Sequence, residues 1–281
     1  MKKSTRITVH KNTEGIIEEI SDEVAIEEPL EFSICFGPSS SRSNKNIAIT
    51  MRTPGNDFEL AMGFLFSEGV INNKNDILSV SRNKELVDDS NLENTVLIEL
   101  NESVKLDPDK IRNFYINSSC GICGSAMVEG ISKIQPIDNN TSNLEIDESV
   151  LRQLPENLRQ KQDAFGITGG LHASALFNVN GEILNLFEDV GRHNALDKII
   201  GQQLNENALP LSSSGLILSG RTSFELVHKS ALAGIPMIVA IGAPSSLAIE
   251  AAWEYKITLV GFLNPGRFNI YSYPKRIISF R

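Results

Sequence analysis

Short apolar and β-branched runs, separated by polar connections, dominate the first hundred residues. We expect strands over residues 5–9, 30–36, 46–52 and 95–100. One helical pattern interrupts them. It begins at Asn56, which we expect to cap the helix together with Glu59, and it ends at Gly69. These elements predict a small α+β domain over residues 1–112.

From residue 146 onward, strand and helix patterns alternate. Two apolar runs, 173–177 and 183–187, flank an Asn-Gly pair that favours a tight hairpin. We then expect helices over 192–204, 223–233 and 246–255, alternating with strands over 216–219, 237–241 and 258–263. Because each helical stretch has the length of a crossover, these three strands should be parallel neighbours. The pattern predicts an α/β domain over residues 146–281, and the polar segment 113–145 links the two domains.

Charge and composition exclude several classes of protein. The 281 residues include 26 Lys and Arg against 35 Asp and Glu, giving a net charge of −9. This balance argues against a protein that binds nucleic acid or a membrane through a basic face. We find no signal peptide and no apolar run of about 18 residues that could span a membrane. Three cysteines make no disulfide framework, so we expect a cytoplasmic protein.

The sharpest chemical feature is the pair Cys120 and Cys123, set among serines and glycines in the linking segment. A structural zinc site would need two more ligands, and a thioredoxin-type pair would follow a strand in a βαβ unit; both remain alternatives. We favour a mobile nucleophile, because Gly121 and Gly124 leave the loop free to bring a thiol to more than one partner. No structural metal is then expected, and we interpret Cys35 as a buried, inert thiol.

Each of the three predicted parallel strands ends in a glycine-bearing turn: 220–223, 242–246 and 264–267. Because carboxyl ends of parallel strands share one edge of a sheet, we expect these turns to form an anion-binding crevice. Arg221 and Arg267 would bind phosphate there. Thr222 and Glu225 are expected to form a capping box that opens the next helix.

Two histidines near this edge could each have more than one role. His172 follows a pair of glycines, and His193 stands at the start of a predicted helix. Each could act as a general base or a metal ligand, and each could equally be a hydrogen-bonded structural residue. The polar cluster over residues 188–198 could line the same crevice. The sequence leaves these roles open.

Taken together, these segments resemble the formate dehydrogenase accessory sulfur-carrier family, FdhD. The matching stretches run in order across most of the chain: 52–60, 118–124, 168–173, 188–201, 219–227, 243–248 and 261–271. The resemblance implies that Cys120 accepts a persulfide sulfur from a cysteine desulfurase, with Cys123 assisting. The sulfur would pass to the molybdenum or tungsten of a bis(molybdopterin guanine dinucleotide) cofactor, a bound substrate, before its insertion into formate dehydrogenase.

The resemblance also implies which residues contact the guanine dinucleotide. By analogy with the family these are Phe262, Leu263, Asn264, Pro265, Gly266 and Arg267. From the predicted crevice we add Arg221 and Ser223. The sequence alone leaves open whether the chain is an enzyme or a carrier with a persulfide intermediate, and which metal it serves. We expect a homodimer, since α/β proteins of this kind commonly are dimers.

The order of C-terminal elements is similar to the cytidine-deaminase fold. The expected fold class is therefore α/β: a C-terminal cytidine-deaminase-like α/β/α sandwich with a smaller N-terminal α+β domain. Zinc deaminases carry His-x-Glu on the first helix and Pro-Cys-x-x-Cys on the second. Here the corresponding places read His193-Asn194-Ala195 and Arg221-Thr222-Ser223-Phe224, without the glutamate or the thiolates. Deaminase chemistry is excluded, which leaves two alternatives to a sulfur carrier: a non-catalytic cofactor-binding chaperone and a zinc-stabilised scaffold.

Overall fold

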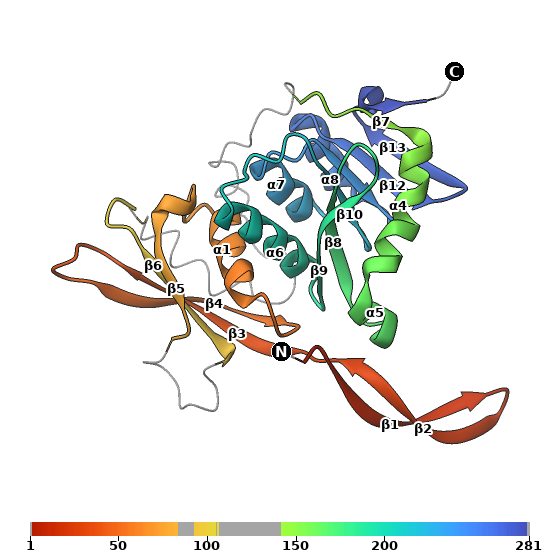
Figure 1. Cartoon of the computed structure of the whole chain (residues 1–281), viewed down its shortest axis with the longest axis horizontal. Helices are drawn as coiled ribbons and strands as arrows, with labels where there is room; N and C mark the ends of the chain where they lie inside the picture. The colour runs from red at the N-terminus through yellow and green to blue at the C-terminus, as the bar shows by residue number, and fades with distance from the viewer. Residues whose placement is uncertain (1, 84–92, 105, 107–141, 280–281) are drawn as a thin grey trace.

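The computed structural model describes residues 2–83, 93–104, 106 and 142–279. Cys120, Cys123 and most of the predicted linker lie outside the described residues. The described chain forms one sheet of six strands, one of four and two of two (Figure 1). None of the helices formed by these residues is long and apolar enough to cross a membrane.

The N-terminal part contains a hairpin and a four-stranded sheet. The hairpin pairs β1 (Ser4–Thr13) with β2 (Ile16–Ala25). The sheet has the order β4-β3-β6-β5, with β3 (Glu28–Phe36), β4 (Ser43–Arg52), β5 (Ile77–Ser81) and β6 (Thr95–Leu100). α1 (Asp57–Ser67) packs on this sheet in a core that includes Leu30, Phe32, Leu60, Leu65 and Ile98. A short 3-10 helix, η1 (Lys74–Asp76), precedes β5.

The start of α1 differs from the sequence prediction. Asn56 occupies the N-cap position, but its φ is 57° and its side chain makes no capping hydrogen bond. The expected capping by Asn56 and Glu59 is therefore wrong. Asparagine tolerates this left-handed backbone better than most residues do. Residues 53–56, Thr-Pro-Gly-Asn, thus turn the chain through their backbone conformation. The side chain of Asp57, the first residue of α1, contacts Arg52 instead.

The C-terminal part is built on the six-stranded sheet, whose order is β13-β12-β11-β10-β8-β9. Its strands are β8 (His172–Phe177), β9 (Ile183–Asp189), β10 (Gly215–Leu218), β11 (Met237–Ala240), β12 (Thr258–Asn264) and β13 (Arg267–Ser272). β10, β11 and β12 are parallel neighbours, and β8 and β9 form an antiparallel hairpin. Both arrangements confirm the sequence prediction.

Helices cover both faces of this sheet. α6 (Arg192–Asn205), α7 (Phe224–Leu232) and α8 (Ser246–Glu254) share one apolar cluster with it. α4 (Glu148–Lys161) covers the other face with Leu151, Leu154 and Leu158, and α5 (Asp163–Thr168) follows it. The short strands β7 (Ile146–Asp147) and β14 (Ile277–Ile278) pair beside η5 (Pro274–Arg276). The result is the expected α/β/α sandwich.

The two parts meet where α1 crosses α6 (Figure 1). Both helices have a glycine at the crossing: a Cβ at Gly63 would lie 1.9 Å from the Asp197 carbonyl oxygen, and one at Gly201 would lie 1.8 Å from that of Glu59. The backbones therefore touch directly. Leu204 of α6 reaches into the N-terminal core. This crossing fixes α6, which carries His193 in its first turn, against the N-terminal sheet.

Candidate functional site

Two of the predicted glycine turns are joined at the carboxyl edge of the six-stranded sheet. The Gly242 amide donates to the Gly220 carbonyl oxygen at 3.2 Å, and the Thr222 amide donates to that of Ala243 at 3.1 Å. A Cβ on Gly242 would lie 2.7 Å from the Arg221 amide nitrogen, so the close approach requires glycine. The structure thus brings the turns after β10 and β11 together, as the parallel arrangement predicts.

Phe262 brings β12 to the same edge. Its amide donates to the Gly242 carbonyl oxygen at 3.1 Å, and its side chain is 40% exposed. Its φ of 54° is uncommon for a bulky aromatic residue. Such conformations cost free energy and persist where the surrounding contacts impose them, often at ligand sites. The neighbouring Leu263 is buried instead, in the core beneath α4.

The third turn is the tip of the β12–β13 hairpin. Asn264 accepts hydrogen bonds from the amides of Gly266 and Arg267, both at 3.0 Å, and Asn264, Pro265, Gly266 and Arg267 are all exposed. Arg152 of α4 donates to the Pro265 carbonyl oxygen at 3.1 Å. Arg221 and Arg267 therefore occupy two separate places along this edge: the turn after β10 and the hairpin tip.

A polar cluster lies where α6 and α7 begin. His193 Nε2 is 3.2 Å from Ser223 Oγ and 3.4 Å from Glu225 Oε2. The hydrogen bond from His193 lowers the pKa of the Glu225 carboxyl to about 2, with a smaller contribution from Ser223 and against the effect of burial. This carboxyl is therefore ionised throughout the neutral range.

His172 adds a second imidazole to the same region. Its ring lies against Gly220, where a Cβ would be 3.1 Å from Nδ1. Burial lowers the pKa of His172, and the positive charges of Arg192, His193 and Arg221 lower it further, while Asp189 opposes them. His172 is thus held neutral beside several cations. These positive charges favour the binding of an anion in this region over the protonation of His172.

The expected capping box at the start of α7 is wrong. The N-cap residue is Ser223, not Thr222, and it makes no side-chain capping hydrogen bond. The Glu225 carboxylate contacts His193, Ser223 and its own backbone amide. Thr222 is 1% exposed, and its hydroxyl has no hydrogen-bond partner within the described chain. Neither α6 nor α7 has a side chain capping its N-terminal amides, and uncapped helix N-termini favour anions.

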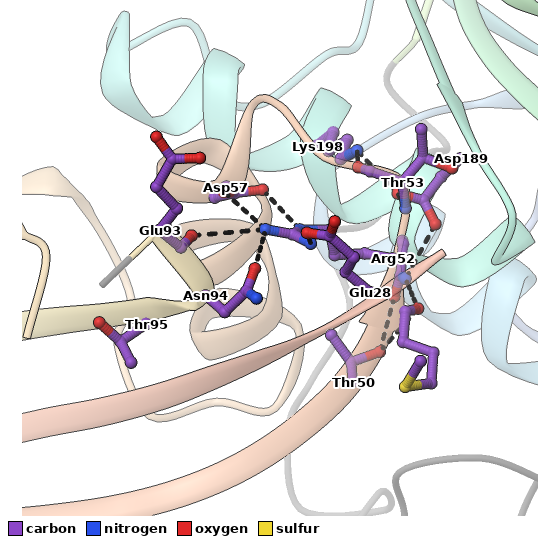
Figure 2. Close-up of polar contacts among 12 residues, drawn as sticks. Glu28, Thr50, Arg52, Thr53, Asp57, Glu93, Asn94, Thr95, Asp189 and Lys198 are labelled. Atoms are coloured by element: carbon purple, nitrogen blue, oxygen red, sulfur yellow. Dashed lines mark hydrogen bonds and ion pairs between the residues drawn. The ribbon is translucent and has the colours of Figure 1, made fainter. Parts of the chain in front are cut away.

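A buried network of polar contacts is centred on Asp189 (Figure 2). Asp189, at the end of β9, accepts from Lys198 Nζ at 2.7 Å and from the Thr53 amide at 3.3 Å. Its other oxygen accepts from Asn194 Nδ2 at 3.0 Å and from the Gly191 amide at 2.8 Å. Burial lowers the pKa of Lys198, and Asp189 counteracts this effect. The network fixes the turn that leads from β9 into α6, directly before His193.

The same network reaches the N-terminal domain through Arg52, which is fully buried (Figure 2). Its guanidinium contacts both oxygens of Asp57, with Nε at 3.0 Å from Oδ1 and a terminal nitrogen at 3.2 Å from Oδ2. Arg82 adds a further contact to Asp57 at 2.9 Å. The Thr53 carbonyl oxygen accepts a hydrogen bond from Lys198 at 3.1 Å. Because Thr53 directly follows Arg52, residues 52 and 53 connect the N-terminal domain to the network around Asp189.

The thiols predicted to carry the chemistry cannot be placed in this geometry. Cys120 and Cys123 lie outside the described residues. Cys35 on β3 is half-buried, so the expectation of a buried thiol is wrong. Within residues 2–83, 93–104, 106 and 142–279, no group of three or more His, Cys, Asp or Glu side chains could hold a metal ion.

Sequence reasoning found the position of this site but missed several of its partners. It named His172, His193, Arg221 and Ser223, and the structure brings their turns to one region. It assigned Glu225 to a cap and did not single out Arg192. Contacts between the starts of two different helices, such as His193 with Glu225, leave no periodic signal in a sequence. Only the adjacency of the strands before them could have suggested the pairing.

Comparison with known proteins agrees with this architecture. Residues 26–278 match the FdhD/NarQ family. The chain is 44% identical over 258 residues to the sulfur carrier protein FdhD of Saccharolobus solfataricus, covering 92% of this chain and 91% of the relative. The corresponding protein of Sulfolobus acidocaldarius is 43% identical over 272 residues, covering 97% and 98%, and that of Mycobacterium tuberculosis is 42% identical over 259 residues, covering 90% and 91%.

A solved structure shares the fold. The crystal structure of a Desulfotalea psychrophila protein, described as a formate dehydrogenase accessory protein, superposes with a TM-score of 0.75. The superposition covers 99% of this chain and 100% of that one, at 24% sequence identity. At this identity the likeness establishes the architecture.

Proposed function

The chain belongs to the FdhD/NarQ family, and from this premise we propose that it is a sulfur carrier that serves the maturation of formate dehydrogenase. The name of its relatives and the Cys120-x-x-Cys123 pair support the sulfur chemistry. The carboxyl edge of the six-stranded sheet supports a second role, the binding of a phosphorylated substrate. The two roles together describe a protein that delivers sulfur to a bound cofactor.

In the proposed reaction, the Cys120 thiolate attacks the outer sulfur of a persulfide on a cysteine desulfurase. The sulfur–sulfur bond of the donor breaks, the desulfurase thiolate leaves, and Cys120 becomes the persulfide. Release of that sulfur as sulfide requires two electrons. The Cys123 thiolate supplies them when it attacks the Cys120 sulfur, because a disulfide then forms and sulfide departs to the metal of the cofactor.

The observation that carries the substrate assignment is the arrangement of cations and uncapped helix N-termini at the sheet edge. Arg221 and Arg192 lie beside the first turns of α6 and α7. The N-cap residues of these helices make no side-chain capping hydrogen bond, and the buried Thr222 hydroxyl has no partner among the described residues. Phosphate oxygens are the acceptors that such a site prefers. Phe262 presents an exposed aromatic ring to the same edge, which suits stacking against a nucleobase. A molybdenum bis(molybdopterin guanine dinucleotide) substrate has both groups.

The sulfur role is tested by formate dehydrogenase activity in cells that carry this chain as their only copy of the carrier. Cys120→Ala should reduce the activity to the level of cells without the protein, because no persulfide can form. Cys35→Ala is the matched control and should leave the activity unchanged, since that thiol lies on β3. Full activity of Cys120→Ala would exclude the sulfur role and favour a chaperone that only binds the cofactor.

The substrate role is tested by calorimetric titration of the full-length protein with GDP. Arg221→Ala and Arg267→Ala should each raise the Kd about tenfold, the loss expected for one charge-assisted phosphate contact. Arg6→Ala removes another exposed arginine, from the β1–β2 hairpin, and should leave the Kd unchanged. An unchanged affinity in both edge variants would exclude the crevice as the nucleotide site.

A further inference from the structure

The tip of the β12–β13 hairpin, residues 264–267, is weakly held by its own sheet. The two strands pair at Gly261 with Asn269 and next at Asn264 with Arg267, and the register is irregular between these two pairs. Such irregularities bend a strand and interrupt its ladder of hydrogen bonds. The direction of the tip is therefore not fixed by strand pairing, and it needs support from another element.

Arg152 of α4, a helix that packs beside β12, supplies this support (Figure 1). Its Nη1 donates to the Pro265 carbonyl oxygen at 3.1 Å, and its guanidinium carbon lies 5.1 Å from the centre of the Phe268 ring. Within the described residues, no other hydrogen bond joins residues 264–267 to a segment outside the hairpin. We propose that Arg152 is a positioning residue, which anchors the tip and thereby places Arg267 for contact with the substrate phosphate. This role rests on the proposed function.

The orientation of Arg152 is fixed by Glu148, one helical turn earlier on α4. Glu148 Oε1 accepts a hydrogen bond from Nε of Arg152 at 3.1 Å and another from Nη2. Two of the three guanidinium nitrogens therefore face Glu148, and the third donates to Pro265. The planar fork of an arginine can serve two such partners at once. Because all three nitrogens already donate within the chain, the arrangement favours a positioning role over direct contact with a phosphate.

α4 is a firm base for this contact. Its inner face packs three buried leucines into the core on one side of the six-stranded sheet: Leu151, Leu154 and Leu158. The Phe268 ring packs against the same core. The anchor therefore fixes the place of Arg267 relative to the sheet and to the turn that carries Arg221. A substrate that contacts both arginines binds more tightly when their spacing is fixed in advance, because ordering the tip on binding would cost affinity.

Cleavage by trypsin after Arg267, which is exposed, reports the order of the tip without any substrate. Arg152→Met removes the donors but keeps an unbranched side chain beside Phe268. Cleavage follows the fraction of molecules in which the tip has left its place, so we expect this bond, identified by mass, to be cut about fivefold faster than in the wild type. Cleavage after the other lysines and arginines should not change.

Arg159→Met is the matched control for this experiment. Arg159 lies on the same helix, and its guanidinium carbon lies 4.4 Å from the centre of the Phe165 ring of α5 instead of beside the hairpin. Its replacement should leave the cleavage rate after Arg267 unchanged. Equal rates in Arg152→Met and the wild type would overturn the proposal, as would a rise shared by all cleavage sites, which would report global unfolding.

Calorimetric titration of the full-length protein with GDP tests whether the anchor acts through Arg267. Arg152→Met alone should raise the Kd about threefold, but it should add less than about 1.5-fold to Arg267→Ala, because the anchored group is then missing. Arg152→Lys should weaken binding as much as Arg152→Met, since a lysine keeps the charge but cannot serve Glu148 and Pro265 together. An equal further loss in the Arg267→Ala background would mean that Arg152 contacts the nucleotide itself, and it would overturn the positioning role.

The titrations also separate this inference from the function on which it rests. If the wild type binds GDP and Arg267→Ala binds it more weakly, while Arg152→Met binds it as the wild type does, the positioning role is overturned and the proposed function stands. If the wild type does not bind GDP, the proposed substrate is overturned together with the role of Arg152 in binding it.

Discussion

The Glu225 carboxylate shows how a single side chain orients its neighbours at this edge. Two arginines and two histidines surround the starts of α6 and α7, and of these four side chains Glu225 contacts His193. The carboxylate therefore orients the His193 ring without cancelling the charge of Arg192 and Arg221. The site keeps a positive field and one fixed imidazole.

This pairing makes stability depend on pH in a defined direction. The pKa of Glu225 lies at about 2 instead of the usual 4.5, so its contribution to folding is complete above about pH 4.5 and is lost as the pH falls toward 2. Between about pH 6 and about pH 3 it should cost about 2 kcal/mol in the free energy of unfolding. Glu225→Gln should remove this part of the pH dependence in urea unfolding curves. A variant with the same acid sensitivity as the wild type would contradict the assignment.

Only some of the residue contacts at the site could be predicted from the sequence. The approach of Gly242 to the neighbouring turn followed from the parallel strands, and so did the position of Arg221. Asp189 and Lys198 lie on either side of a strand-to-helix turn, at a spacing that no helical or strand period pairs. Thr53 belongs to the other domain. Contacts of this kind depend on how whole domains meet, which local patterns do not encode.

At the scale of elements, the crossing of α1 and α6 is the least tolerant part of the fold. Gly63→Ala would place a methyl group 1.9 Å from a backbone oxygen, so the helices must separate. We expect a loss of about 3 kcal/mol or more in the free energy of unfolding, measured by urea denaturation. Gly166→Ala is the matched control, since α5 leaves open space around that position, and it should change the value by less than about 1 kcal/mol.

The prediction for Gly63 has a clear contrary outcome. If Gly63→Ala and Gly166→Ala unfold at the same urea concentration, the two helices are not in backbone contact. A smaller effect would still agree with the account: both variants stay folded, but Gly63→Ala binds GDP more weakly. It would mean that separation of the helices displaces the first turn of α6 and its histidine.

Several elements escaped prediction for reasons that the structure makes clear. β2 reads as an acidic segment, and most of its side chains are exposed. α4 buries Leu151, Leu154 and Leu158 at helical spacing, but Pro155 lies inside it, a residue that ordinarily argues against a helix. The short β5 and α5 lack a strong period, and β13 is an edge strand with mostly exposed side chains. By contrast, every element from β8 to β12 was predicted.

At the scale of the whole molecule, the site lies where the two parts of the chain meet. The six-stranded sheet supplies the turns, and the helices α6 and α7 supply the cluster. The N-terminal part contacts α6 through Gly63 of α1 and through Thr53 after β4. In the proposed function, the carboxyl edge of the six-stranded sheet binds the phosphorylated substrate, and the cysteine pair before α4 carries the sulfur.

The central claim is that Cys120 carries sulfur, and mass spectrometry of the intact protein tests it most directly. The full-length chain, Cys120→Ala and Cys123→Ala would each be incubated with a cysteine desulfurase and cysteine. Cys123→Ala should gain about 32 Da, the mass of one sulfur atom, because Cys123 can no longer release the sulfur as sulfide, and Cys120→Ala should gain nothing. A Cys123→Ala protein without the adduct, or an adduct that persists in Cys120→Ala, would contradict the account.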